Sequence, residues 1–182
     1  SSYKRLKAIF ANQMSQEYFP VSFNELKSKI NFAAECMPEY KINNYLITTI
    51  RANHPTFTVG LRADGKDNSF VFITDNELRG GRINTKWDEF VAFCRNATYL
   101  NHDAQFTDQE YPQRKGWGHS TFEQVLELAH AAQVQHLRFV HHDPDRKDTN
   151  LDELEQHYQS VAKSLSRQFS VAAIKELEEI NL

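Results

Sequence analysis

The segment HHDPDRKD, from His141 to Asp148, directly follows the apolar run Leu137 to Val140. A short apolar run that ends in two histidines and an Asp-Pro turn predicts a buried strand with imidazoles in the loop at its carboxyl end. In α/β proteins, binding and catalytic groups gather at the carboxyl ends of strands. The segment therefore predicts an α/β fold with a functional loop at this place. A surface turn that happens to hold two histidines is the alternative.

Three predicted strands end in side chains that can bind a metal ion. The strands cover residues 41–50, 69–74 and 137–140, and the side chains that follow them are His54, Asp75, and His141 or His142. Two imidazoles and a carboxylate from separate strand ends can converge on one cation, and this mixture suits zinc, manganese or iron. For each residue taken alone, a structural or surface role is the alternative. The prediction therefore depends on the fact that all of them follow the end of a strand.

The rest of the chain predicts further strands and amphipathic helices around these three strands. We expect strands at 57–62 and 97–101, and helices at 3–14 (with Leu6, Ile9 and Phe10 buried), 23–30, 85–93 and 150–167, and one that starts near His119. Ser22 with Glu25, and Ser120 with Glu123, have the spacing of capping boxes. The polar stretch 103–118 is a long loop, which is often functional. Residues 169–182 are ambiguous between a helix and a closing strand at 179–182.

Composition indicates a soluble globular protein with one domain over residues 1–182. The net charge of −3 and the pI of about 6.2 give no global reason to bind nucleic acid or an anionic membrane. No apolar run approaches the roughly 18 residues of a membrane span, and no signal-peptide pattern opens the sequence. Cys36 and Cys94 form no CxxC pair, so we expect reduced thiols in a cytoplasmic protein.

Several motifs together resemble one family of hydrolases. The motifs are QMSQEYFPV, NHP, VFITDNE, DAQFTDQEY, KGWGHSTFEQVLELA and FVHHDPDRKD. In this order they resemble the metallo-β-lactamase-fold hydrolases, and above all the phosphodiesterase-like branch that includes ribonuclease Z and phosphoribosyl cyclic phosphodiesterase. The resemblance implies the C-terminal portion of an αββα sandwich and covers almost the whole chain.

The resemblance also implies metal ligands around two divalent ions, with zinc expected before manganese or iron. It makes His54 a ligand of one ion, Asp75 the carboxylate that bridges both, and His141 a ligand of the second, with His142 as the alternative. His119 becomes a proton donor or a hydrogen-bond partner of a substrate phosphate.

The same resemblance implies supporting roles near these ligands. Arg114, Lys115 and the nearby glycine amides would hold the phosphate, with a solvated loop as the alternative. Asp103 and Asp143 are candidates for orienting the ligand imidazoles. The implied reaction is hydrolysis of a cyclic nucleotide, a cyclic phosphate or another small phosphodiester by a metal-bound hydroxide.

The first metal motif of the family, HxHxDH, does not occur in this sequence. Without it the three ligands leave each ion underbound, and without the first strands one sheet face lacks its cover. We therefore expect an incomplete domain, to be completed by an N-terminal segment or a complementing chain, and unstable alone. A non-catalytic binding or scaffold domain, and a hydrolase of thioesters or lactams, are the alternative functions. A homodimer is left open.

Overall fold

The computed structural model describes residues 2–32 and 39–180, with side chains from Leu6 onward, and the chain divides into two units. Residues 1–38 form one unit and residues 39–182 the other, and each is described by itself. The assignment of residues 1–182 to a single domain stays a prediction. The candidate ligands named above all belong to the second unit.

The first unit contains helix α1 (Ser2–Gln13) and the short 3-10 helix η1 (Phe23–Glu25). The rings of Phe10, Phe23 and Phe32 pack on one another with centroids 5.8–6.5 Å apart. The expected helix at 23–30 is wrong beyond this single turn. The Ser22 hydroxyl donates to the Glu25 carboxylate at 2.6 Å and caps no backbone amide. The sequence predicts that Leu6, Ile9 and Phe10 are buried, but each of these residues keeps more than two fifths of its surface exposed.

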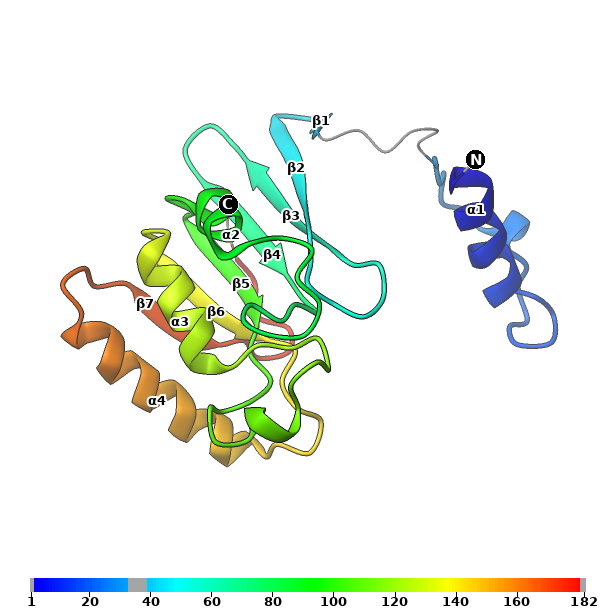
Figure 1. Cartoon of the computed structure of the whole chain (residues 1–182). Coiled ribbons are helices and arrows are strands. Elements are labelled where there is room, and N and C mark those ends of the chain that lie inside the picture. The colour runs from blue at the N-terminus through cyan, green and yellow to red at the C-terminus, as the bar shows by residue number, and fades with distance from the viewer. Residues whose placement is uncertain (1, 33–38, 181–182) are drawn as a thin grey trace. The chain divides into compact units, whose positions relative to one another are not determined.

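A seven-stranded sheet, ordered β1 to β7 along the chain, forms the second unit (Figure 1). Its strands are β1 (Glu39–Ile42), β2 (Tyr45–Arg51), β3 (Val59–Asp64), β4 (Ser69–Ile73), β5 (Tyr99–Asp103), β6 (His136–Val140) and β7 (Ser170–Ala173). The pairs from β1 to β4 are antiparallel, and those from β4 to β7 are parallel. Strand β2 therefore runs in the same direction as β4 to β7, and all five strands end at the same edge of the sheet.

Three helices supply the parallel crossovers and cover one face of the sheet (Figure 1). They are α2 (Trp87–Cys94), α3 (Phe122–Ala131) and α4 (Asp148–Ser164). Alternate residues of β4, such as Val71 and Ile73, enter the core, where they join Phe90, Phe122 and other apolar side chains of the helices. Strand β6 is buried along Leu137 to Phe139, as expected of a strand inside a parallel sheet.

Several element boundaries differ from the sequence-based expectation. The run 41–50 is two strands, because Asn43 adopts a left-handed conformation with φ 53° and turns the chain between β1 and β2. Helix α3 is capped by Thr121, whose hydroxyl accepts from the Gln124 amide, and not by Ser120. The closing strand is β7 and not 179–182: residues 179 and 180 form no strand, and 181–182 lie outside the described residues.

Candidate metal centre

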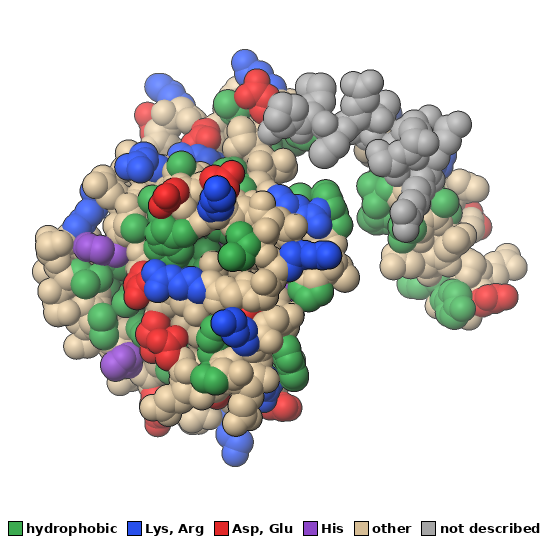
Figure 2. All heavy atoms as spheres, in the orientation of Figure 1, with side chains coloured by type: hydrophobic (Ala, Val, Ile, Leu, Met, Phe, Trp, Pro, Cys, Tyr) green, Lys and Arg blue, Asp and Glu red, His purple; other side chains and the backbone are tan. Residues whose placement is uncertain are grey.

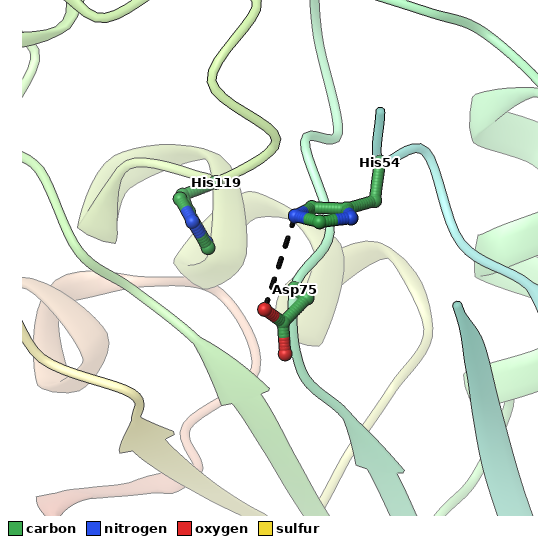
Figure 3. Close-up of side chains that lie close together, drawn as sticks. All are labelled: His54, Asp75 and His119. Atoms are coloured by element: carbon green, nitrogen blue, oxygen red, sulfur yellow. Dashed lines mark ion pairs between the residues drawn. The ribbon is translucent and has the colours of Figure 1, made fainter. Parts of the chain in front are cut away.

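The loops after β2, β4 and β6, together with the end of the loop before α3, place four candidate side chains at one edge of the sheet. Figure 3 shows His54, Asp75 and His119 directed toward one another. One ligand atom from each of these three residues lies within 4.8 Å of the others. The His141 ring stacks on the His119 ring with centroids 5.0 Å apart. Residues separated by up to 87 positions in the sequence thus meet because their strands share one direction.

Asp75 lies between two imidazoles. Its Oδ1 atom is 3.9 Å from His54 Nε2 and 3.7 Å from His141 Nε2. A tetrahedral zinc ion bound at about 2.0–2.2 Å holds its ligand atoms roughly 3.4 Å apart. The two separations are a few tenths of an ångström longer, so a small movement of the side chains would let a cation bind between each pair. The same carboxylate oxygen belongs to both pairs, and Asp75 could therefore contribute to two ion positions, with His54 at one and His141 at the other.

Two of the candidate ligands have a left-handed backbone. Asp75 has φ 51° and His141 has φ 55°. Left-handed conformations cost free energy for residues with a Cβ atom and persist where the surrounding structure imposes them. Asp75 and His141, whose side chains approach each other, are thus both held in a strained backbone conformation.

His119 is oriented by Asp103. The His119 Nδ1 atom is 2.7 Å from Asp103 Oδ2, and the Asp103 side chain is fully buried. The other Asp103 oxygen accepts from the Ser120 amide, and Oδ2 also accepts from the Asn76 amide. These bonds fix a carboxylate that holds Nδ1 of His119 and leaves Nε2 for a metal ion, a proton or a substrate oxygen.

The protonation of His119 reflects opposing influences. Burial by itself lowers the pKa of this imidazole, but the hydrogen bond to Asp103 and the negative charges of Asp103, Asp75 and Glu77 outweigh burial. The pKa of His119 is therefore raised above its ordinary value. A raised pKa favours the protonated form, as a proton donor requires.

His54 is held from both sides. Its Nδ1 atom lies 2.9 Å from Thr56 Oγ1 and accepts from the Thr56 amide at 3.3 Å, and these contacts direct Nε2 toward Asp75. On the other side the backbone of Gly118 abuts the ring, since a Cβ atom at Gly118 would clash with His54 Cδ2. Gly118 also has φ 97°, so both its conformation and its contact require glycine.

Glu77 fixes the long loop, and sequence reasoning missed this residue. Its carboxylate is buried with 1% exposure and accepts from Tyr111 Oη at 2.5 Å, Gly116 N at 2.9 Å and Gly118 N at 3.2 Å. Burial and this carboxylate raise the pKa of the Tyr111 phenol above its ordinary value. The signal available in the sequence was the TDNE string that follows β4, of which only the aspartate was assigned a role.

Buried asparagine residues connect the loops that carry the candidate ligands, and sequence reasoning missed these residues too. Asn53 Oδ1 accepts from the Asn84 and Thr85 amides, and the Asn53 amide donates to Asn76 Oδ1. Asn76 Nδ2 lies 3.0 Å from Nε2 of His102, which is fully buried. Burial lowers the pKa of His102 and outweighs the opposing effect of Asp103, so this imidazole is neutral.

The remaining predicted site residues lie around the four central side chains. His142 packs on the Phe122 ring, 6.3 Å away, and not against Asp75. Arg114 pairs with Asp143 at 3.8 Å, so Asp143 contacts a cation and not a candidate ligand imidazole. Lys115 is exposed, and its side chain lies beside Gly80. Of the two adjacent histidines, the structure brings His141 to the centre.

Solved structures share this fold. The metallo-β-lactamase fold protein YhfI from Bacillus subtilis superposes with a TM-score of 0.60 at 18% identity, over 77% of this chain and 50% of that chain. Human tRNase Z, short form, gives 0.54 at 17% identity, over 79% and 47%. The matched part of the chain therefore has part of a metallo-β-lactamase fold, as the sequence predicts.

One curated protein is similar in sequence over a short stretch. A segment of 73 residues is 33% identical to Ribonuclease Z from Halalkalibacterium halodurans, and it makes up 40% of this chain and 23% of that protein. The chain spans about half the length of the two structures named above. No family model matches the sequence. Among the described residues, no helix is long and apolar enough to cross a membrane.

Proposed function

We propose that this chain carries part of the active centre of a metal-dependent phosphodiester hydrolase. The observation that carries the proposal is the position of Asp75 Oδ1 within 4 Å of an imidazole nitrogen on either side. His54 with Asp75 would hold one divalent ion, and His141 with Asp75 a second. Ions held at this place would supply a Lewis acid that lowers the pKa of water and neutralises charge on phosphoryl oxygens.

The protein side chains position the substrate and move a proton. His119, held at Nδ1 by Asp103, donates from Nε2 to the leaving oxygen of the ester. The Arg114 guanidinium and the Lys115 ammonium bind phosphate oxygens by charge-assisted hydrogen bonds. The substrate class is a small phosphodiester, with a cyclic nucleotide or a cyclic phosphate among its members, and the ions are zinc, manganese or iron.

The proposal includes ligands from outside these residues. Within the described chain the centre offers each ion two protein ligands, whereas zinc takes four. We infer that a further segment or a second chain supplies the others and covers the sheet face opposite α2 to α4. The apolar character of this sheet face supports the inference. Leu61 of β3 is 36% exposed and pairs with Phe72 of β4, whose ring stacks on that of Phe70.

The test is hydrolysis by the completed, metal-loaded protein. Asp75→Ala should abolish turnover of a phosphodiester and leave the fold intact, because it removes the oxygen shared by both ion positions. Asp67→Ala is the matched control, since Asp67 is an exposed aspartate in the turn between β3 and β4. Turnover that survives Asp75→Ala would reject the proposal. A completed protein that neither binds metal nor hydrolyses would favour the scaffold alternative.

A further inference from the structure

The loop before α3 carries an exposed indole next to the candidate centre. Trp117 is 56% exposed. The residue after it, Gly118, abuts the His54 ring, and the next, His119, belongs to the centre. Trp117 therefore stands at the rim of the site, two residues before His119 and next in the chain to the glycine that contacts His54.

An arginine lies over the Trp117 ring. The Arg114 guanidinium carbon is 4.9 Å from the Trp117 centroid and 5.4 Å from that of Phe106, whose ring is 6.2 Å from the His119 ring. These four side chains form a continuous series of ring and cation contacts from the centre to the exposed indole. Because the guanidinium covers one side and more than half of the residue is exposed, the indole keeps a surface open to a ligand.

The hydrogen bonds that Glu77 accepts from this loop, here called the Glu77 clamp, hold the backbone of Trp117 in place before any ligand binds. Glu77 accepts hydrogen bonds from the amides of Gly116 and Gly118, the two neighbours of Trp117 in the chain. Both glycines have positive φ, at 88° and 97°, which directs the backbone through this turn. A side chain on a fixed backbone loses little freedom when it binds, so stacking on it is less costly.

We propose that Trp117, backed by Arg114, is a stacking subsite for an aromatic base of the substrate. The proposal rests on the proposed phosphodiester function and narrows it to phosphodiesters of nucleosides. An indole face stacks on any purine or pyrimidine, and an arginine behind it adds a cation–π contribution. A ribose phosphate without a base would reach the phosphate-binding groups and gain nothing from Trp117.

The first test uses the fluorescence of the indole itself. The chain has two tryptophans, so Trp87→Phe leaves Trp117 as the only reporter. Titration with adenosine 5′-monophosphate to millimolar concentration should quench this fluorescence, and ribose 5-phosphate should leave it unchanged. Equal responses to both compounds, or none to either, would overturn the proposal.

The second test measures affinity by calorimetry on variants. Trp117→Ala should weaken binding of adenosine 5′-monophosphate by roughly tenfold, the size of a base–aromatic stack, and leave ribose 5-phosphate binding unchanged. Trp87→Phe is the matched control, because Trp87 also has an arginine over its ring but packs against the core at α2. An unchanged nucleotide affinity in Trp117→Ala would contradict the subsite.

These outcomes are separate from those of the proposed function. Base-dependent binding without hydrolysis by the completed protein would keep the subsite and reject the hydrolase. Hydrolysis that is indifferent to the base and to Trp117→Ala would keep the hydrolase and reject the subsite.

Discussion

At the scale of single residues, the candidate centre depends on side chains placed by unfavourable backbone conformations. His141 has φ 55° in the turn after β6, and its ring is thereby stacked on His119 with Nε2 toward Asp75. His142, one residue later, packs on Phe122 instead. The choice between two adjacent histidines is therefore made by the backbone of the turn.

We predict that this conformation has a measurable cost at His141. His141→Gly and His141→Ala both remove the imidazole, but glycine adopts positive φ freely and alanine does not. The glycine variant should therefore be more stable than the alanine variant by about 1 kcal/mol. Urea unfolding of both variants measures the difference, and equal midpoints would show that the strain is absent.

At the scale of elements, the loop 103–118 is organised by one buried carboxylate. Glu77, four positions beyond the end of β4, binds Tyr111 from the middle of the loop and the amides of Gly116 and Gly118 from its end. The loop contains one short 3-10 turn, η2 (Tyr111–Gln113), and a β-bridge between Phe106 and Thr121, and the Glu77 carboxylate adds hydrogen bonds to its end that the backbone does not supply.

We predict that Glu77→Gln loosens this loop. Glutamine keeps the size of the side chain but turns one acceptor oxygen into a donor that faces amide N–H groups, so a buried bond is lost. Stability should fall by about 1–3 kcal/mol, and hydrogen exchange at the Gly116 and Gly118 amides should accelerate. Glu127→Gln is the control, because Glu127 is half-exposed and pairs with Arg79 on the surface. If the Gly116 and Gly118 amides exchange at the same rate in Glu77→Gln as in Glu127→Gln, Glu77 does not hold this loop.

At the scale of the whole molecule, the centre exists only in the folded sheet. Its ligands follow β2, β4 and β6, and they meet because these strands run in the same direction.

Surface charge does not mark a second binding region. On the face drawn in Figure 2, Lys and Arg side chains are interspersed with Asp and Glu, with no broad region of one sign. Specific recognition is therefore expected at the centre and its rim.

We predict that divalent metal stabilises the fold. An ion that binds the folded state alone adds about 2.7 kcal/mol when its free concentration is 100 times the dissociation constant. Zinc should therefore raise the unfolding midpoint of the chain, and a chelator should reverse the effect. Asp75→Asn should remove most of the rise, whereas Asp67→Asn should keep it. An equal rise in both variants would mean that zinc binds elsewhere.

Local sequence patterns were sufficient to predict much of the second unit. The buried strand before His141, the strand ends at His54 and Asp75, and the crossover helices follow from apolar periodicity. The motifs also gave the fold class, which the solved structures confirm. These features depend on neighbours within a few residues, so the chain specifies them locally.

Long-range pairing decided what local patterns could not. The run that contains Phe23 formed a single 3-10 turn, and the Phe23 ring packs on that of Phe10. Glu77 and Asn76 became structural centres only when the strand order brought distant amides and hydroxyls to their polar atoms. A buried polar side chain must find its hydrogen-bond partner wherever the fold provides one. The sequence by itself determined the elements and the types of ligand, and only the tertiary structure decided which side chains meet and what holds them.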